Sequence, residues 1–170
     1  VAVLDMNAER GEAVAREIGG VFARCDVSDE QSCEAAIQTA RAAHGVERVL
    51  VNCAGIAPAK RTVSKKRDTG EIVAHDTASF ARTIGVNLIG SFTMIAKCAA
   101  AMSALSPVDG DGQRGCIIST ASVAATDGQI GQVAYAASKG GVLGMTLPIA
   151  RDLAASGIRV NTIMPGLFET

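Results

Sequence analysis

The stretch Val49-Leu-Val-Asn-Cys-Ala-Gly55 joins a short apolar run to a turn of small residues. An almost continuous apolar run is typical of a strand in a parallel sheet whose two faces are covered by helices. The small residues that follow let a flat ligand approach the backbone closely, although an ordinary tight turn after a strand has a similar composition. This stretch therefore predicts an α/β fold with a candidate ligand-binding turn at the end of one strand.

Two strand–helix units precede this strand. Val1–Leu4 is an apolar run that ends at Asp5, and Asn7 has the side chain expected of a residue that begins a helix. Val21–Ala23 repeats the strand pattern, and Ser28, with a glutamine three residues later, forms a capping box at the start of the next helix. Each unit therefore predicts one strand and one crossover helix.

Two more strands and two long helices follow. The apolar runs Cys116–Ser119 and Val160–Ile163 predict the strands, and we expect helices at 76–104, broken near Gly90, and at 133–155. Strands that alternate with helices imply right-handed crossovers and a parallel sheet. We predict a single α/β domain that spans the whole chain of 170 residues and is built on a doubly wound, Rossmann-like parallel sheet.

A glycine motif in the second of two polar stretches matches the pattern of a nucleotide-binding loop. Gly110, Gly112 and Gly115 satisfy G-x-G-x-x-G. They precede a strand, whereas a pyrophosphate loop follows a strand and presents its N–H groups at a helix start. We interpret the match as a false positive and expect both polar stretches, Ala59–Asp76 and Ser106–Arg114, to be surface loops.

The order of the first strands suggests that part of the fold is missing. A nucleotide-binding fold of this type has a first strand and a glycine turn before the strand that ends in a ribose-binding acid. Here the strand that ends at Asp5 comes first in the sequence. We therefore expect that the first strand with its glycine loop, and the C-terminal end of the fold, are absent from this chain.

The composition argues against several classes of function. The 16 basic and 17 acidic residues nearly cancel and 48% of the residues are hydrophobic, so nothing indicates a nucleic-acid tract, an acidic tail or disorder. No apolar run approaches the roughly 18 to 20 residues of a membrane span. We expect a small-molecule substrate and cofactor as partners, with no nucleic acid and no membrane.

The residue types that bind metals or form disulfides show no site pattern. The 5 cysteines are scattered and odd in number and lack close CxxC pairs, which indicates buried thiols in a reducing compartment and a cytoplasmic protein. His44 and His75 have no second metal-type ligand at a suitable spacing. We therefore expect no metal site.

Tyr135 and Lys139 are four residues apart in a predicted helix, so their side chains share one face about one turn apart. Tyrosine ionises near pH ~10, and a fall of about three pH units requires roughly 4 kcal/mol of preferential phenolate stabilisation by a nearby ammonium and a cationic nicotinamide. Tyr135 would then be a general base. The alternative is an ordinary helix pair, because this spacing is common.

Two further polar residues have both a functional and a structural interpretation. Ser122 follows the strand that ends at Ser119, at the carboxyl end of the sheet where ligands bind, but it would equally satisfy backbone groups in a turn. Asn87 lies in the apolar stretch 84–89, where an unpartnered amide costs roughly 1 to 3 kcal/mol. It is either catalytic or a helix-kink residue bonded to a backbone carbonyl.

These residues together resemble the ordered motifs of the short-chain dehydrogenase/reductase family. Both the order and the spacing match, over essentially the whole chain. The matching positions are Asp5, Cys25-Asp26-Val27, Asn52-Cys53-Ala54-Gly55, Asn87, Ser122, Tyr135-Ala-Ala-Ser-Lys139 and Pro165-Gly166.

The resemblance implies a role for each site residue. Tyr135 would exchange a proton with the substrate oxygen, Ser122 would hold that oxygen, and Lys139 would bind the nicotinamide ribose and favour the phenolate. Asn87 would support a proton-relay water. The implied cofactor-binding residues, in which Cys53 is a wall residue and not a nucleophile, are Asp5, Asp26, Val27, Asn52, Cys53, Ala54, Gly55, Tyr135, Lys139, Pro165, Gly166, Phe168 and Thr170.

Asp5 favours NAD over NADP as the cofactor. A carboxylate about 4 Å from a 2′-phosphate costs about 4 kcal/mol per charge pair at an effective dielectric constant near 20. Arg10 lies one helical turn away, and we expect it to be solvated.

Within the family, the segments 51–57, 120–125, 144–153 and 165–168 resemble the members that oxidise (S)-3-hydroxyacyl-CoA to 3-ketoacyl-CoA. This resemblance implies an acyl-CoA substrate and a place in fatty acid metabolism, with side activity on hydroxysteroids or other secondary alcohols. The basic stretch from Lys60 to Arg67 would then meet the phosphates of coenzyme A, or it is a solvated loop.

Two alternatives stay open at this point. A 3-oxoacyl-acyl-carrier-protein reductase would ordinarily use NADPH and carry a basic residue near the adenosine ribose, where this chain has Asp5. A catalytically silent dinucleotide-binding subunit would share the fold, but the intact set of Ser122, Tyr135 and Lys139 argues against it. The family resemblance and the small residues in both long helices predict a homotetramer.

Overall fold

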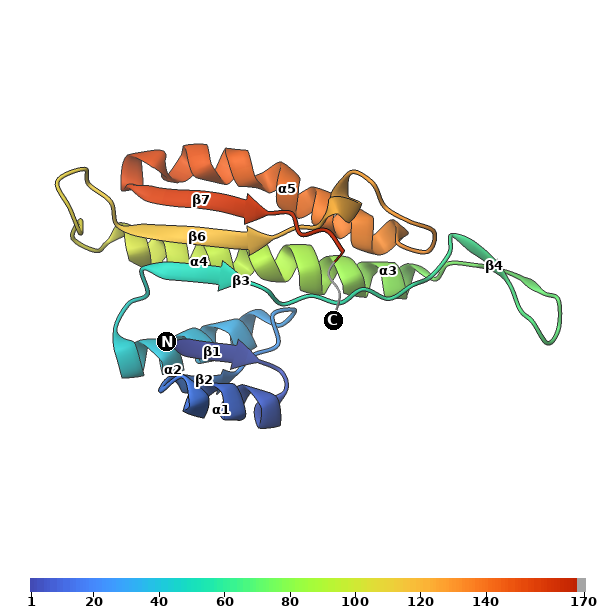
Figure 1. Ribbon diagram of the computed structural model, residues 1–170, viewed down its shortest axis with the longest axis horizontal. Helices are drawn as coiled ribbons and strands as arrows, with labels where there is room; N and C mark the ends of the chain where they lie inside the picture. Colours follow the sequence, from blue (N-terminus) through green and yellow to red (C-terminus); the bar gives the residue numbers. More distant parts are fainter. Residues whose placement is uncertain (168–170) are drawn as a thin grey trace.

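The computed structural model describes residues 1–167, which form an α/β fold (Figure 1). The strands and α-helices are β1 (Ala2–Asp5), α1 (Ala8–Glu17), β2 (Val21–Arg24), α2 (Glu30–His44), β3 (Val49–Asn52), β4 (Val63–Lys65), β5 (Ile72–Ala74), α3 (Thr77–Ile84), α4 (Ser91–Ser103), β6 (Gly115–Thr120), α5 (Val133–Leu153) and β7 (Ile158–Ile163). This order confirms the alternation of strands and helices that the apolar runs predict.

The parallel strands form two separate pieces of sheet. β1 pairs with β2, and β6 lies between β3 and β7. Within residues 1–167 no strand pairs with the facing edges of β1 and β3. A cavity of about 660 Å³, the β1–β3 groove, lies between these edges and is lined in part by Leu4, Cys25, Leu50 and Cys98. The predicted sheet is therefore present as two parallel pieces.

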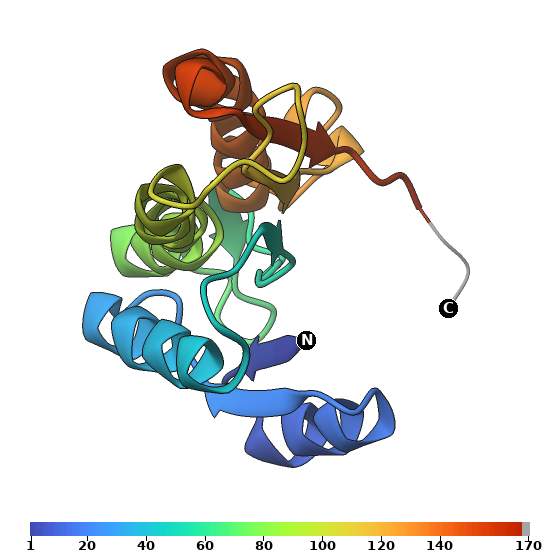
Figure 2. The ribbon, with the colours of Figure 1, turned by 90° about the vertical axis from the view of Figure 1, so that its left-hand side faces the viewer.

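The helices cover the two faces of the strands unequally. Figure 2 shows α2, α4 and α5 on one side, whereas α1 lies on the other side against β1 and β2. The crossovers from β3 to β6 and from β6 to β7 run in the same direction with the same hand, so both place their helices on one face. Within the described residues no helix covers the opposite face of β3, β6 and β7. Val49, Val51 and Ile163 are more than half exposed there. The predicted cover on both faces is thus present only at β1 and β2.

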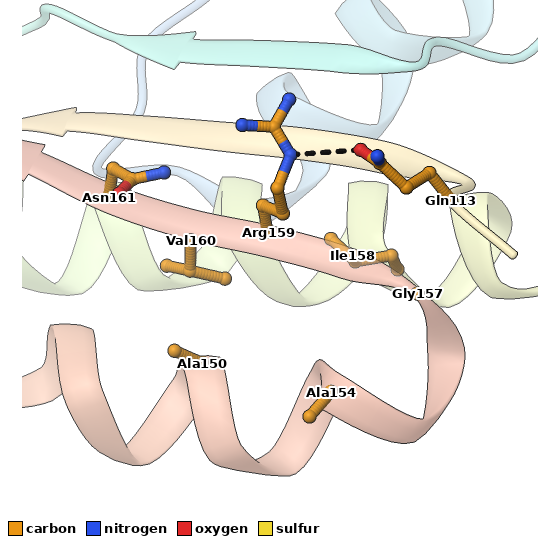
Figure 3. Close-up of a pocket in the computed structure, with 8 residues that line it drawn as sticks. All are labelled: Gln113, Ala150, Ala154, Gly157, Ile158, Arg159, Val160 and Asn161. Atoms are coloured by element: carbon orange, nitrogen blue, oxygen red, sulfur yellow. Dashed lines mark hydrogen bonds between the residues drawn. The ribbon is translucent and has the colours of Figure 1, made fainter. Parts of the chain in front are cut away.

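Along β7 the side chains alternate between α5 and the bare face. Ile158, which is 3% exposed, and Val160 lie on the side of α5, where Ala150 points toward the strand (Figure 3). Arg159 points to the other face and donates to Gln113 Oε1 across 3.0 Å. A cavity of about 420 Å³ lies along this part of the strand. The period of two thus determines which residues of β7 anchor α5.

The helix starts agree with the sequence pattern in one case and differ in another. Asn7 caps α1 and accepts a hydrogen bond from the Arg10 N–H, as predicted. The capping box at Ser28 is wrong, because α2 is capped by Asp29, whose side chain accepts the N–H two residues later. The Ser28 hydroxyl instead donates to Asp26 Oδ1 across 2.6 Å.

Residues 77–103 form one continuous helical stretch. α3 runs into a π-helical turn, Gly85–Gly90, and α4 follows with right-handed helical backbone at the junction. The predicted break near Gly90 is therefore wrong, and the irregularity is a wider turn of the kind often found at functional sites. The expectation that no segment has the length of a membrane span also fails, because Thr77–Ser103 is long and apolar enough by length and composition. In this structure α4 packs against β3, β6 and α2.

The stretch 59–76, which we expected to be a surface loop, contains an antiparallel hairpin. β4 and β5 pair with each other and project from the body of the molecule (Figure 1). Two of the five basic residues in this stretch have acidic partners, since Lys60 pairs with Asp76 and Lys66 with Glu71. The positive charge available to an anionic ligand is accordingly smaller than the sequence suggests.

Candidate active site

The carboxyl ends of the parallel strands bring the predicted cofactor-binding residues to one edge. Asp5 ends β1, Asp26 follows β2, and the turn 53–55 follows β3. Ser122 follows β6, and Pro165-Gly166 follows β7. Figure 1 shows β1, β3, β6 and β7 pointing in the same direction, so all of these segments lie at the edge where open α/β sheets bind ligands.

Three other predicted features lie away from this edge or cannot be placed. The glycine motif at 110–115 precedes β6, at the opposite edge of the sheet, so its interpretation as a false positive is confirmed. Phe168 and Thr170, predicted to lie around the nicotinamide, fall outside the described residues. Within residues 1–167 no group of three or more His, Cys, Asp or Glu side chains is placed to hold a metal ion.

Lys139 is buried beside Tyr135 in the first turns of α5. The residue is 5% exposed, and its Nζ lies 5.7 Å from the centroid of the Tyr135 ring. Nζ also donates to the carbonyl oxygen of Thr120 across 2.5 Å. Burial lowers the pKa of Lys139 below its usual 10.5. The four-residue spacing therefore places an ammonium group in a poorly hydrated position next to a phenol.

Ser122 has the turn-stabilising contact expected of its structural interpretation. Its backbone is extended, and its Oγ accepts the N–H of Ala124 at 3.1 Å, which caps a short 3₁₀ turn, Val123–Ala125. Accepting this bond leaves the hydroxyl hydrogen free to donate. The structural and functional interpretations of Ser122 are therefore compatible, because a capped hydroxyl in a fixed orientation still provides a donor.

Asn87 is fully engaged in hydrogen bonds within the protein. It is 1% exposed and lies in the π-helical turn. Its Oδ1 accepts the Ile56 N–H at 2.8 Å, and its Nδ2 donates both to the Ile56 carbonyl and to Ser138 Oγ, each at 2.9 Å. The amide side chain thus joins two segments of the site, as a buried amide must to avoid a desolvation cost.

The turn after β3 is open and has small side chains. Asn52 donates to Ser119 Oγ across 3.3 Å and so ties β3 to β6, whereas Cys53, Ala54 and Gly55 are exposed. A Cβ added to Gly55 would lie 3.4 Å from Asn87 Oδ1 and 3.8 Å from Lys139 Nζ. The absence of side-chain bulk at Gly55 therefore keeps the space beside Lys139 free.

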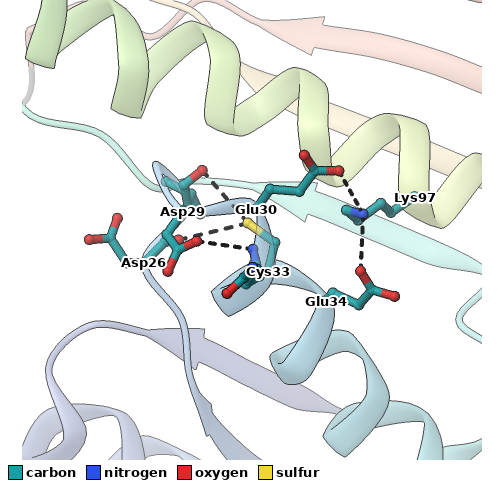
Figure 4. Close-up of polar contacts among 8 residues, drawn as sticks. Asp26, Asp29, Glu30, Cys33, Glu34 and Lys97 are labelled. Carbon is teal, nitrogen blue, oxygen red and sulfur yellow. Dashed lines mark hydrogen bonds and ion pairs between the residues drawn. The ribbon is translucent and has the colours of Figure 1, made fainter.

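The loop after β2 is held by polar contacts. The Asp26 carboxylate accepts hydrogen bonds from the hydroxyl and the N–H of Ser28, which lowers its pKa below 3.8. The Cys33 thiol points toward the carbonyl oxygens of Asp26 and Val27, at 3.8 and 3.6 Å (Figure 4). These contacts hold the backbone of the candidate adenine site in one conformation.

Asp5 presents its carboxylate to solvent at the end of β1. One of its oxygens accepts the N–H of Asn7 at 2.7 Å, which orients the side chain. Arg10 is exposed on the first turn of α1, as expected for a solvated residue. The position therefore carries an oriented negative charge where an adenosine ribose would lie.

Sequence reasoning missed three contributors to the site. Thr120 offers a carbonyl to Lys139, the backbone of Ile56 binds Asn87, and the Ser138 hydroxyl lies between Asn87 and α5. Backbone contacts of this kind have no signature in a sequence. Ser138 did leave a signal, because it stands directly before Lys139 in the Tyr135-Ala-Ala-Ser-Lys139 motif.

Comparison with known proteins identifies the family. Residues 1–170 match the family model described as short chain dehydrogenase. The chain belongs to this family. A 3-hydroxyacyl-CoA dehydrogenase type-2 of Bos taurus is 52% identical over 170 residues, which cover 99% of this chain and 63% of that protein. The resemblance stated from the motifs is thereby confirmed.

Two further relatives of this short-chain dehydrogenase bear on its activity. A 3-oxoacyl-[acyl-carrier-protein] reductase of Mus musculus is 33% identical over 172 residues, which cover 100% of this chain and 65% of that protein. The crystal structure of 3-hydroxyacyl-CoA dehydrogenase type-2 from Mycobacterium avium matches with a TM-score of 0.87 at 42% identity, over 99% of this chain and 65% of that chain. The chain spans about 63 to 65% of the length of these relatives.

The strand ends fit the nicotinamide dinucleotide, NAD(H) or NADP(H), that short-chain dehydrogenases bind. The open turn at Cys53-Ala54-Gly55 has accessible backbone, and Lys139 next to it would offer a donor to a ribose hydroxyl. Asp5, which is exposed at the end of β1, would offer an acceptor to the other ribose. Within residues 1–167 the fit covers the adenosine and nicotinamide ends, and no glycine motif follows a strand to hold a pyrophosphate.

Proposed function

We propose that this protein is an NAD-dependent oxidoreductase that interconverts a secondary alcohol and a ketone. The observation that carries the proposal is the burial of the Lys139 ammonium beside Tyr135 at the carboxyl edge of the sheet. Buried lysines are rare unless they are paired, and within residues 1–167 no carboxylate pairs with Lys139. A functional role for the ammonium group explains why this cost is tolerated.

The side chains support proton transfer to and from a substrate oxygen. In the oxidative direction the Tyr135 phenolate accepts the proton of the substrate hydroxyl, and in the reductive direction the phenol returns it. Ser122 donates its free hydrogen to the same oxygen and stabilises the negative charge that develops there. The nicotinamide, when bound, accepts or supplies the hydride. Lys139 favours the phenolate by its charge and binds the nicotinamide ribose.

We propose (S)-3-hydroxyacyl-CoA, oxidised to 3-ketoacyl-CoA, as the substrate, which places the reaction in fatty acid metabolism. The support is the 52% identity to a 3-hydroxyacyl-CoA dehydrogenase type-2, compared with 33% to a 3-oxoacyl-[acyl-carrier-protein] reductase. Among the basic residues of the β4–β5 hairpin, Arg61, Lys65 and Arg67 form no ion pair within residues 1–167 and would meet the phosphates of coenzyme A. Hydroxysteroids and other secondary alcohols are proposed side substrates.

NAD, not NADP, is the proposed cofactor. The exposed carboxylate of Asp5 is oriented by the Asn7 N–H and repels a 2′-phosphate. The same charge argues against the reductase alternative, which would ordinarily use NADPH. The silent-subunit alternative requires Tyr135, Lys139 and Ser122 to lie at the ligand-binding edge without a role.

We also propose a homotetramer in the cytoplasm. Apolar side chains are exposed on α4 and α5 and on the π-helical turn that precedes α4, and Ile89, Phe92 and Leu147 are each more than half exposed. A surface of this kind suits contact with another copy of the chain. All 5 cysteines are free thiols, which suits a reducing compartment, but the prediction that they are buried is wrong for Cys53, which is exposed.

The test is NADH formation from NAD and (S)-3-hydroxybutyryl-CoA by the full-length protein, with Tyr135→Phe as the variant. We expect turnover in the parent and a loss of about 100-fold or more in the variant, because general acid–base groups contribute factors of this size. Stronger turnover with NADP would favour the reductase. No turnover with any secondary alcohol, despite dinucleotide binding, would favour the silent subunit.

A further inference from the structure

A buried hydroxyl connects α5 with the π-helical turn. Ser138 is 0% exposed, and its Oγ accepts a hydrogen bond from Asn87 Nδ2 at 2.9 Å. The same hydroxyl donates to the carbonyl oxygen of Tyr135 at 2.7 Å. Its hydrogen and one lone pair are therefore both committed to residues of the candidate site.

Asn87 extends this connection to the turn after β3. Its amide forms a two-point contact with the backbone of Ile56, at 2.8 and 2.9 Å, in the manner of a neighbouring strand. The second hydrogen of Nδ2 needs another acceptor, and solvent does not reach it because Asn87 is 1% exposed. Within the described residues Ser138 Oγ is that acceptor.

We propose that Ser138 is a positioning residue that, through Asn87, fixes the turn 53–56 relative to Tyr135 and Lys139. The inference rests on the function proposed above, since the turn would hold the cofactor and α5 carries the proton-transferring group. A serine in a helix commonly bonds only to its own backbone, as Ser103 does to the Ala99 carbonyl at 2.8 Å. Ser138 makes this bond and also bonds to a second element.

The spacing between the two segments is small enough for this connection to matter. Lys139 follows Ser138 directly, and its Nζ lies only 3.8 Å from where a Cβ on Gly55 would stand. Removal of the Ser138 hydroxyl leaves a buried amide hydrogen of Asn87 without an acceptor. The π-helical turn or the turn after β3 must then shift to satisfy it, and a displacement of about 1 Å in reacting groups costs up to 100-fold in rate.

The test compares Ser138→Ala with Ser103→Ala in the full-length protein. Both variants remove a helical serine hydroxyl, but only Ser138 bonds to the site. For Ser138→Ala we expect kcat to fall by about 10-fold or more, with a smaller change in the KM for the alcohol because Ser138 does not contact substrate. We also expect the midpoint of the kcat–pH profile to move upward and the Kd for NADH to rise by about threefold or more.

Ser103→Ala should leave all of these quantities within about twofold of the parent. The proposal is overturned if Ser138→Ala changes only the unfolding temperature while kcat, the pH profile and the NADH affinity stay at parental values. If Ser138→Ala fails to fold, Ser138→Cys replaces it, since a thiol is nearly the same size but a weak acceptor. The same changes in kcat, the pH profile and NADH affinity in Ser138→Cys support the proposal, and parental values of all three overturn it.

The NADH measurement separates this inference from the proposed function. If the parent binds NADH but turns over no alcohol, the proposed function fails, and a selective loss of NADH affinity in Ser138→Ala still supports the connection. In that case, equal NADH affinities in Ser138→Ala and Ser103→Ala overturn the proposed role of Ser138. A parent that binds no NADH overturns both.

Discussion

The ammonium group of Lys139 donates to the carbonyl oxygen of Thr120 across 2.5 Å and so joins α5 to the carboxyl end of β6. This carbonyl replaces some of the hydration that the ammonium loses on burial, but it carries no full negative charge. The effect of burial on the ammonium therefore outweighs that of the hydrogen bond, and the pKa of Lys139 lies below 10.5.

The lowered pKa of Lys139 predicts a stability that increases in alkaline solution. Between that pKa and 10.5 the unfolded chain binds a proton at Lys139 that the folded chain does not, so the free energy of unfolding rises with pH across this window. Each unit of pKa difference contributes about 1.4 kcal/mol. Urea unfolding of the parent and Lys139→Met at a series of pH values measures the effect. The prediction fails if the difference between the two proteins is independent of pH.

Asp5 is predicted to determine the choice of cofactor. Replacing it in Asp5→Ser removes the charge that repels a 2′-phosphate, so the ratio of kcat/KM with NADP to that with NAD should rise by about 100-fold or more. Glu9→Gln is the matched control, because Glu9 is an exposed acid in the first turn of α1 and should leave the ratio unchanged. An equal change in both variants would show that net charge, and not Asp5, sets the preference.

Two glycines of the π-helical turn offer a matched pair for testing its packing. A Cβ on Gly90 would lie 2.7 Å from the Val27 carbonyl oxygen, whereas a Cβ on Gly85 would meet nothing within 4 Å. We expect Gly90→Ala to destabilise the protein by about 1 to 3 kcal/mol and to weaken NADH binding, since it displaces Val27. Gly85→Ala should be neutral or stabilising by up to about 1 kcal/mol. Similar unfolding free energies for the two variants would contradict this account.

Arg41 and Glu47 form a two-point ion pair at 2.6 and 2.8 Å. Burial raises the pKa of Glu47, but the hydrogen bonds from Arg41 and Cys98 outweigh it and hold the pKa below 4.5. The pair thus stabilises the fold above pH 4.5, and this contribution is lost as the pH falls through the lowered pKa.

Removing one partner of this pair should destabilise the protein strongly at neutral pH. Arg41→Met leaves the Glu47 carboxylate partly buried without its main donor, which costs about 1.5 to 3 kcal/mol in unfolding free energy. The cost should shrink as acid neutralises Glu47. Lys66→Met is the control, because its pair with Glu71 is about half exposed on both sides and contributes less than about 1 kcal/mol. Equal losses of unfolding free energy in Arg41→Met and Lys66→Met at pH 7 would show that the pair of Arg41 with Glu47 contributes no more than an exposed ion pair.

Much of the fold was predictable because its elements depend on local pattern. The apolar run at Val49–Val51 became β3 with one added residue, and Asn7 caps α1 as its side chain indicates. The cap of α2 was not predictable in the same way, since Ser28 and Asp29 are both good caps and are adjacent. The choice depends on the Asp26 carboxylate, which binds the Ser28 hydroxyl.

The site was predictable where one element carries it and unpredictable where two elements meet. Tyr135 and Lys139 share a helix face, so their spacing predicts their proximity. Lys139 and Thr120 are 19 residues apart, and Asn87 and Ser138 are 51 apart. Such contacts depend on how the helices dock on the sheet. In the π-helical turn Gly90 lies close to the Val27 backbone, and no local pattern encodes this approach.

The two kinds of free strand edge in this structure have different consequences for self-association. The outer edge of β7 is open on one side within the described residues, so a strand from another molecule that pairs with it offers a new edge in turn, and such growth has no natural end. The β1–β3 groove is bounded by strands on both sides and is saturated once one strand lies in it. The outer edge of β2 is open in the same way, so an outer edge permits growth without end, whereas the groove admits one strand and then offers no further edge.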